Sequence, residues 1–546
     1  MQHNARAIVE TLQAVVGKAA AHVQPVDEHQ AVAYDVASMS SSVAAAVALL
    51  GHQAHARSRR VGAGGLGAGG LGPGDLDDDG AEDDLALLYA ADVAAELAGR
   101  MTGREGLWGV DRTALDGMAA HVAAGRDPGL LERVAERVMA TGEAGPRHLS
   151  DELQLVRTAF REFAADQIAP AAGRIHRDDE DIPDAIIDGL ADMGCFGLSI
   201  PASYGGYAEG GADELLSMVV VTEELSRASL GAAGSLITRP EIIGAAIARG
   251  GTEEQKRRWL PAIASGERLC AVAVTEPDCG SDVAAITTSA VRDGEEWVLN
   301  GVKTWCTFAG RAHYLLVLAR TDPDRTAAHR GLSLFVVEKP SFTGHTWHLT
   351  QEGGGSVEGR AIRTLGYRGM HSFEVGFGGW RVPAADLIGL DDGLGRGFYL
   401  QMRSFANARL QTAARAVGVM QSALELAVDY ARQRPVFGRS LADYQLTRAK
   451  IARMAALIAA CRAFTFAAAR AVAAGDGDLE AAQVKQVACR AAEWVTREAQ
   501  QLHGGYGYAE EYAVSRLFVD ARVLSIFEGA DEVLALRVIA RRLAQP

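Results

Sequence analysis

A glutamate in an apolar run near the C-terminus is the residue best suited to catalysis in this chain. Glu528 follows Ile526 and Phe527 and precedes Gly529. Burial among apolar neighbours disfavours the charged carboxylate, so we expect the pKa of Glu528 to lie above the usual value of about 4.3. Such a carboxylate is a stronger general base near neutral pH. A glutamate before glycine also occurs at ordinary helix ends, so its chemistry depends on the motifs upstream.

A glycine-containing loop after a predicted strand is the first of these motifs. The segment 274–282 reads V-T-E-P-D-C-G-S-D and follows the apolar run 271–274. Pro277 and Gly280 permit a backbone path along which N–H groups approach a ligand closely. An ordinary turn after a strand has the same composition, so the segment indicates a binding loop only together with the other motifs.

A tryptophan follows two predicted turns in the middle of the chain. Asp293-Gly294 and Asn300-Gly301 each fall between apolar runs, and both dipeptides are strong hairpin signals. Residues 305–307, W-C-T, come directly afterwards. A tryptophan there either belongs to the core or provides a surface on which a planar cofactor stacks.

The C-terminal third contains groups suited to binding phosphate. Arg434 precedes Phe437, and Gly504 and Gly505 follow Gln501. A guanidinium forms bidentate hydrogen bonds to phosphate, and adjacent glycines let backbone N–H groups approach one. For a single arginine, a surface ion pair is the simpler interpretation.

Hydrophobic patterning predicts an α+β chain of four domains. They are a helical extension over residues 1–145 with a Gly- and Asp-rich linker at about 61–84, a helical domain over 150–269, a β domain over 270–390 and a helical bundle over 391–546. Helical periodicity marks three of them, and alternating or β-branched runs mark the β domain. The string 62–67 matches G-x-G-x-x-G, but more glycines and aspartates follow it instead of a helix, so we interpret it as linker.

Bulk composition excludes several classes of function. The 546 residues carry a net charge of −15, which disfavours a nucleic-acid partner. Six scattered cysteines without a C-x-x-C pair predict neither a disulfide framework nor a zinc site, and we expect no metal. The N-terminus lacks a signal-peptide pattern, and we expect no apolar run to approach the roughly 20 residues of a membrane span. We therefore expect a cytoplasmic protein without a membrane partner.

Taken in order, these motifs resemble the acyl-CoA dehydrogenase family from about residue 150 to the end of the chain. The resemblance implies an N-terminal helical domain, a middle β domain and a C-terminal four-helix bundle, here with an additional N-terminal extension. It also implies FAD as cofactor. The residues expected at the cofactor are Val274, Thr275, Gly280, Ser281, Trp305, Cys306, Thr307, Arg434, Phe437, Gln445, Gln501, Gly504, Gly505, Ala530 and Glu532. Ala530 departs from the family pattern, which has a threonine at this position.

The resemblance also implies a reaction and partners. Glu528 would abstract the α-proton of an acyl-CoA thioester while the β-hydrogen leaves as hydride to the flavin. Substrate contacts are expected from Ser281, Asn407, Arg409 and Gly529. The C-terminal elements of the family contact the FAD of a neighbouring subunit, which implies a homodimer or homotetramer. An electron-transferring flavoprotein is the expected electron acceptor.

Arg239 indicates the class of acyl group. It lies in the helical region that walls the acyl pocket of the family, where a buried arginine would pair with a second carboxylate. We therefore expect a short branched dicarboxylic acyl-CoA of the methylsuccinyl-CoA type, with Arg368 and His371 as weaker candidate anchors. The alternatives are another short-chain, branched-chain or glutaryl-CoA dehydrogenase, an acyl-CoA oxidase, or a DNA-associated flavoprotein of the same fold without activity.

Overall fold

The chain divides into two compact units. The computed structural model describes residues 2–63, 79–403 and 405–545. One unit comprises Met1–Thr158 with Thr412–Pro546, and the other comprises Ala159–Gln411. The string 62–67 and the predicted linker lie largely outside the described residues. The predicted C-terminal end of the linker, at about residue 84, was wrong, because residues 79–84 form the start of helix α3. Acidic side chains stabilise the N-terminal end of a helix, which explains why this acidic stretch is helical.

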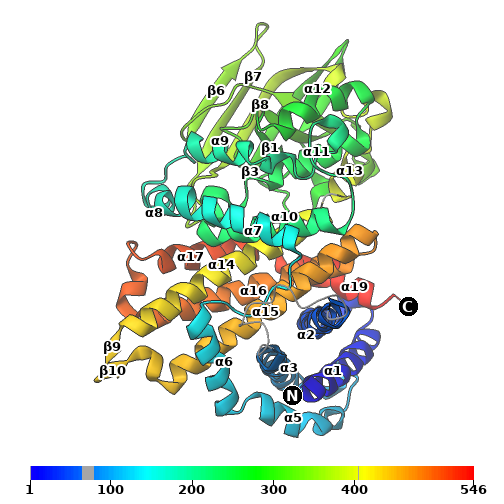
Figure 1. Ribbon diagram of the computed structural model, residues 1–546. Helices are drawn as coiled ribbons and strands as arrows, with labels where there is room; N and C mark the ends of the chain where they lie inside the picture. The colour runs from blue at the N-terminus through cyan, green and yellow to red at the C-terminus, as the bar shows by residue number, and fades with distance from the viewer. Residues whose placement is uncertain (1, 64–78, 404, 546) are drawn as a thin grey trace. The chain divides into compact units, whose positions relative to one another are not determined.

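The first unit is helical and joins the N-terminal extension to the C-terminal bundle (Figure 1). Its longer helices are α1 (Gln2–His22), α2 (Gln30–Ala63), α3 (Asp79–Met101), α6 (Pro128–Thr141), α15 (Gln445–Ala474), α16 (Asp478–His503) and α17 (Ala513–Leu524), with most of α14 (Phe405–Gln433) and the first part of α7 (Asp151–Phe163). Short elements are α4 (Glu105–Trp108), α5 (Ala119–Gly125), α18 (Asp531–Val533), α19 (Ala540–Leu543) and the hairpin β9 (Pro435–Val436) and β10 (Arg439–Ser440). Helix α2 packs against α15 and α16, and α6 packs against α15.

Two of these helices are more apolar than we expected from the sequence. The Gln30–Ala54 part of α2 and the whole of α15 are long and apolar enough to cross a membrane by length and composition alone. The expectation that no run approaches a span was therefore wrong. Within the fold, 67% and 78% of their most apolar windows are buried. Packing against neighbouring helices accounts for this composition, since an all-round apolar helix is typical of a protein core.

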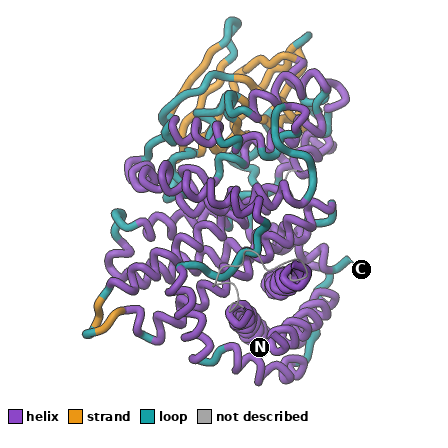
Figure 2. Tube along the Cα trace, viewed as in Figure 1, coloured by secondary structure: helices purple, strands orange, loops and turns teal. Residues whose placement is uncertain are grey.

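The second unit combines helices with one eight-stranded sheet (Figure 2). Its strands are β1 (Cys270–Ala273), β2 (Ser289–Asp293), β3 (Glu296–Thr307), β4 (Tyr314–Arg320), β5 (Leu332–Glu338), β6 (Thr346–Thr350), β7 (Ser356–Ile362) and β8 (Ser372–Pro383), and its helices are α8 (Ala169–Asp178), α9 (Asp184–Asp192), α10 (Ala212–Ala228), α11 (Thr238–Gly250), α12 (Glu253–Ala264) and α13 (Gly397–Arg403). The strand order is β1-β4-β2-β3-β8-β7-β6, with β5 on β4. Helices and a separate β region confirm the α+β prediction.

One of the two predicted hairpins is present. Asp293 pairs with Glu296 across a two-residue turn, and Gly294 has φ 62° as such a turn requires. The prediction for Asn300-Gly301 was wrong, because both residues lie inside β3 at a shift of register with β8. Gly301 has φ 143°, and a Cβ there would lie 2.6 Å from the Thr288 hydroxyl. Glycine therefore serves a β-bulge at this position.

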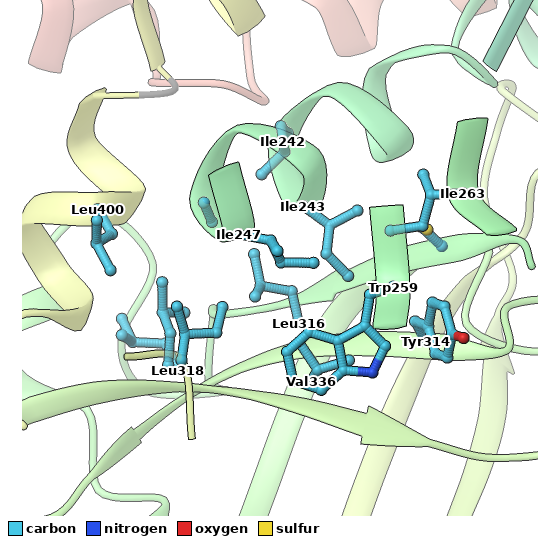
Figure 3. Packing of buried hydrophobic residues seen from close by; sticks show 14 of the residues in the cluster. Ile242, Ile243, Ile247, Trp259, Ile263, Tyr314, Leu316, Leu318, Val336 and Leu400 are labelled. Atoms are coloured by element: carbon cyan, nitrogen blue, oxygen red, sulfur yellow. The ribbon is translucent and has the colours of Figure 1, made fainter. Parts of the chain in front are cut away.

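Apolar side chains of α11 and α12 pack on one face of the sheet (Figure 3). Trp259 is fully buried in this layer, together with Ile243 and Ile247 from α11 and Leu316 and Val336 from the strands. Each large apolar side chain buried in this way contributes about 1.5–3 kcal/mol. The layer includes Cys270 and Val274, so it holds β1 and the start of the loop that follows it.

Candidate active site

The loop after β1 is tied to β3 by a buried ion pair. Lys303 donates from Nζ to the Val274 carbonyl oxygen and to Glu276 Oε1, both at 2.9 Å. The Thr304 N–H donates to the Thr275 carbonyl oxygen at 2.8 Å. Lys303 is fully buried and Glu276 is 5% exposed. The predicted cofactor residues Val274 and Thr275 are therefore held on a rigid backbone.

Glu276 stays ionised in this setting. Burial alone would raise the pKa of its carboxyl, but the Lys303 ammonium and hydrogen bonds from Thr288 and Thr287 lower it to about 2. The Thr287 and Thr288 N–H groups donate to the two carboxylate oxygens at 2.7 and 2.8 Å. Gly280 and Ser281, farther along the loop, are exposed, as a ligand contact requires.

The end of β3 presents a tryptophan to the surface. Trp305 is 56% exposed and has φ 58°, next to a register shift between β3 and β8. The core interpretation of this tryptophan was wrong, because the bulge turns its side chain outward. Cys306 is fully buried, and Thr307 shares a 3.0 Å hydrogen bond with the Ser372 hydroxyl. A bulge that redirects one aromatic side chain is typical of strand ends beside binding sites.

Arg239 is buried at the start of α11. It occupies the first turn of α11, is 5% exposed, and donates from Nη2 to the Tyr367 hydroxyl at 3.4 Å. Burial raises the pKa of Cys306 to about 12, and the charges of Lys303 and Arg239 act in the opposite direction.

A polar network continues from Arg239 along α11 to α14. Thr238 donates to Gln411 Oε1 at 2.6 Å, and the Gln411 amide also contacts the buried Glu241 carboxylate. The predicted substrate residues Asn407 and Arg409 precede Gln411 in α14, and both are half-buried. The Arg409 guanidinium lies 5.7 Å from the centre of the Phe405 ring.

Arg368 and His371, the weaker anchor candidates, have other partners. The Arg368 guanidinium donates to the carbonyl oxygens of Thr364 and His176 at 3.2 and 2.8 Å. His371 contacts Asp181 at 3.0 Å. Both side chains therefore hold the backbone around Tyr367.

In the first unit, three predicted cofactor residues line one cavity. Arg434, Gly504 and Gly505 surround a space of about 550 Å³ together with His503 and Tyr506. Gly504 has φ 60° at the end of α16, and a Cβ on either glycine would meet open space. A guanidinium beside exposed glycine backbone suits a pyrophosphate.

Other predicted cofactor residues of this unit are exposed. Phe437 and Gly438 form the tip of the β9–β10 hairpin with φ 49° and 83°, and Phe437 is 95% exposed. A bulky residue rarely adopts such a backbone conformation. At this exposure the Phe437 ring is almost entirely accessible to solvent and is not packed on its own hairpin. Gln501 is exposed, and Gln445 donates to Glu132 at 3.3 Å.

Glu528 lies in the turn between α17 and α18. It has φ 53°, a left-handed conformation that costs a glutamate about 1–2 kcal/mol. The side chain is half-buried and Ile526 is 54% exposed, so the expected apolar burial is only partial. Strained backbone at a candidate catalytic residue is the pattern found at functional sites. Gly529 follows with φ 100°, and Ala530 and the exposed Glu532 come next.

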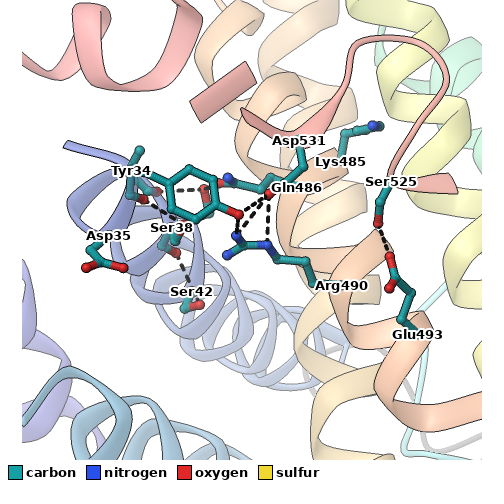
Figure 4. Close-up of polar contacts among 12 residues, drawn as sticks. Tyr34, Asp35, Ser38, Ser42, Lys485, Gln486, Arg490, Glu493, Ser525 and Asp531 are labelled. Carbon is teal, nitrogen blue, oxygen red and sulfur yellow. Dashed lines mark hydrogen bonds and ion pairs between the residues drawn. The ribbon is translucent and has the colours of Figure 1, made fainter. Parts of the chain in front are cut away.

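The turn is held by residues that sequence reasoning missed (Figure 4). Lys485 of α16 donates to the Gly529 carbonyl oxygen at 2.6 Å. Arg490 of α16 and Tyr34 of the extension both donate to Asp531, at 2.9 and 2.6 Å. No local pattern marks these residues as partners.

Comparisons with known proteins match most of this chain. The models of the N-terminal, middle and C-terminal domains of acyl-CoA dehydrogenase match residues 150–267, 271–378 and 395–544. The (2S)-methylsuccinyl-CoA dehydrogenase of Cereibacter sphaeroides is 46% identical over 400 residues, 73% of this chain and 71% of that protein. An acyl-CoA dehydrogenase of Bacillus subtilis (strain 168) is 37% identical over 71% of this chain and 97% of its own length.

Solved structures agree with these matches. The butyryl-CoA dehydrogenase of Megasphaera elsdenii superposes with a TM-score of 0.66 at 30% identity, over 73% of this chain and 99% of that one. A glutaryl-CoA dehydrogenase of Mycobacterium smegmatis, solved in complex with FADH2, has a TM-score of 0.60 at 26% identity, over 71% and 93%. These structures confirm the fold that the motifs predicted.

Proposed function

We propose a function from the premise that this chain belongs to the acyl-CoA dehydrogenase family of oxidoreductases acting on CH–CH donors. The reaction is the α,β-dehydrogenation of (2S)-methylsuccinyl-CoA to mesaconyl-CoA, a step of the ethylmalonyl-CoA pathway in the cytoplasm. The observation that carries the substrate is Arg239, a buried arginine in the first turn of α11.

A long segment outside the matched region, shared with the Cereibacter sphaeroides relative, supports methylsuccinyl-CoA as the substrate. The Cereibacter sphaeroides relative matches this chain over 71% of its length, so it too has a long segment outside the match. The Bacillus subtilis acyl-CoA dehydrogenase matches over 97% of its length and has almost none. A long unmatched segment thus accompanies the higher identity.

The catalytic residue is Glu528. It removes the α-proton, and the strained backbone at Glu528 and Gly529 sets the direction of its carboxylate. A backbone N–H of this turn donates to the thioester oxygen and stabilises the developing enolate. Arg239 pairs with the distal carboxylate, which fixes the α- and β-carbons relative to the base. Asn407, Arg409, Ser281 and Gly529 complete the contacts to acyl-CoA.

FAD, when bound, supplies the acceptor for the hydride that leaves the β-carbon. Trp305 and Thr307 would hold its ring system, with Val274, Thr275, Gly280, Ser281 and Cys306 around it. Arg434, Gly504 and Gly505 suit the pyrophosphate, with Phe437, Gln445, Gln501, Ala530 and Glu532 beside them. The exposed Phe437 ring and the open glycine cavity support contact with the cofactor of a second subunit, hence a homodimer or homotetramer. An electron-transferring flavoprotein reoxidises the enzyme.

Anaerobic reduction of the purified flavoprotein tests this function. The full chain is mixed with (2S)-methylsuccinyl-CoA, butyryl-CoA or glutaryl-CoA, and bleaching of the flavin and the mass of the product are followed. We expect bleaching with methylsuccinyl-CoA that is lost in Glu528→Gln and kept in Glu510→Gln, a change of an exposed glutamate.

Each other outcome identifies a different enzyme. Bleaching by butyryl-CoA alone would overturn the substrate but keep the reaction. Release of CO2 from glutaryl-CoA would identify a decarboxylating dehydrogenase, and rapid reoxidation by air would identify an oxidase. A protein that binds flavin but is reduced by none of the three would overturn the reaction itself.

A further inference from the structure

Two histidines and two aspartates meet in the second unit, outside the residues used above for catalysis. Asp179 caps the C-terminal end of α8, and Asp181 follows two residues later. His345 immediately precedes β6, and His371 immediately precedes β8. Among the residues that the structure describes, Asp179, His345 and His371 are the one group of this kind whose ligand atoms all lie within 4.8 Å of one another.

The distances match the edges of a small tetrahedron. His345 Nε2 lies 3.3 Å from His371 Nε2, and His371 Nε2 lies 3.4 Å from Asp179 Oδ1. His345 Nε2 lies 3.7 Å from Asp179 Oδ2 and 3.0 Å from the Asp179 carbonyl oxygen. Tetrahedral Zn²⁺ with bonds of about 2.0–2.1 Å places neighbouring ligand atoms about 3.3–3.4 Å apart. The two distances that meet at His371 Nε2 therefore have the length that zinc requires, and the third, to the other Asp179 oxygen, is longer.

Asp181 orients one of the rings. His371 Nδ1 lies 3.0 Å from Asp181 Oδ1, and the other Asp181 oxygen accepts the Gly344 N–H at 2.5 Å. A hydrogen bond from Nδ1 to this carboxylate leaves the lone pair of His371 Nε2 directed at His345. A carboxylate on the far nitrogen of a histidine ligand is the usual second shell of a metal site.

The local charge also suits a divalent cation. Two carboxylates, those of Asp179 and Asp181, lie beside the histidines, and the Arg368 Nε lies 3.9 Å from Asp179 Oδ1. The Arg368 hydrogen bonds go to the carbonyl oxygens of Thr364 and His176, so Asp179 keeps oxygen lone pairs for another ligand. The His371 side chain is 5% exposed and the His345 side chain is 49% exposed, which leaves a path from solvent.

We propose that Asp179, His345 and His371 bind one divalent transition-metal ion, and that the ligand set of two imidazoles and a carboxylate suits Zn²⁺. The ion would join the end of α8 to the starts of β6 and β8. The carbonyl oxygen of His371 accepts the Phe308 N–H at 2.8 Å. The next residue, Ser372, contacts the Thr307 hydroxyl with its own hydroxyl. The metal would thus fix the backbone that supports the end of β3.

Zinc titration of the full-length protein tests this site. Protein stripped with a chelator and dialysed is titrated with ZnCl2 by calorimetry, and Co²⁺ is added in parallel to record visible absorption bands. We expect one Zn²⁺ per chain. Asp181→Asn removes a group that only orients a ligand, so it should weaken Zn²⁺ binding about 10–100-fold. His345→Ala and His371→Ala each remove a ligand and should weaken Zn²⁺ binding more than that.

His348 provides the matched control. It lies in β6, three residues from His345, with a 56% exposed side chain whose ring is 3.6 Å from Glu358. His348→Ala should bind Zn²⁺ as the parent does. No binding by the parent, or equal binding by the parent and His345→Ala, would overturn the site. Because the His345 side chain is half exposed, its replacement keeps the test valid even if His371→Ala does not fold.

Discussion

Tyr34 donates a 2.6 Å hydrogen bond to Asp531, which lies 497 residues away in the sequence and three residues after Glu528. Arg490 contacts both, and its guanidinium lies 4.9 Å from the centre of the Tyr34 ring. Burial and the Asp531 hydrogen bond raise the pKa of Tyr34, while Arg490 acts against them. The phenol therefore stays a donor at neutral pH. Through this contact the N-terminal extension helps to hold the turn that carries Glu528.

Tyr34→Phe tests whether that contact positions the base. Loss of a hydrogen bond to a charged group should lower the free energy of unfolding by about 1.5–3 kcal/mol. We also expect a several-fold lower kcat for the acyl-CoA substrate with an unchanged flavin content. Stopped-flow reduction and chemical denaturation measure the two effects.

Tyr89→Phe is the control for Tyr34→Phe. Tyr89 is 3% exposed and donates to the Ser42 carbonyl oxygen at 3.3 Å, a contact between α3 and α2 that lies away from the Glu528 turn in the sequence. It should lower stability to a similar degree without changing kcat. Equal kcat values in the two variants would contradict a positioning role for Tyr34.

Glu276→Gln should change the response to acid. The folded-state pKa of Glu276, about 2, lies below its usual value. Its ionised form therefore contributes stability that is fully present above about pH 5 and is lost as the pH falls through about 4.3 towards 2. In Glu276→Gln this acid-dependent loss should disappear. The variant should also be less stable at neutral pH by about 3–5 kcal/mol, because the buried Lys303 loses its partner.

Denaturation over a series of pH values measures the Glu276 effect. Glu295→Gln serves as the control, since Glu295 is exposed in the β2–β3 turn. It should unfold in acid as the parent does. If Glu276→Gln kept the parental acid dependence, the ion pair would not be its source.

Trp305→Ala should weaken flavin binding without unfolding the sheet. An indole that is 56% exposed contributes little to the core, so we expect a stability change within about 0.5 kcal/mol. Loss of a stacked ring should cost about 0.5–1.5 kcal/mol of FAD affinity. Calorimetry on the apoprotein and thermal unfolding measure the two quantities.

Trp297→Ala gives the opposite pattern in the same strand. Trp297 is 5% exposed and packs edge-on against Phe335 at 5.6 Å. Its removal should destabilise the unit by about 3–5 kcal/mol. If Trp305→Ala destabilised the protein as much as Trp297→Ala, Trp305 would belong to the core.

Local signals predicted the elements better than the contacts between them. The Asp293-Gly294 turn was predicted because its geometry depends on two adjacent residues. Asn300-Gly301 has the same composition, but the close approach of Thr288 makes it a bulge, and no neighbour in sequence reveals that contact. Family resemblance paired Arg434 with Gly504, and both line one cavity. The Tyr34–Asp531 pair could not be predicted, since only the packing of α2 against the C-terminal segment that follows Glu528 creates it.

Arg239→Met separates recognition of the second carboxylate from the chemistry of the base. A buried cation that pairs with a substrate carboxylate contributes through that partner, and its removal should cost about 2–5 kcal/mol. We therefore expect kcat/KM for methylsuccinyl-CoA to fall by at least about 30-fold, mainly through KM, while the slower turnover of butyryl-CoA is unchanged or improved. Tyr367→Phe, which removes the hydroxyl that Arg239 contacts at 3.4 Å, should cause a smaller loss with the same selectivity. An equal loss for both substrates would mean that Arg239 only supports α11, and the specificity for a dicarboxylic acyl group would then have to come from other residues.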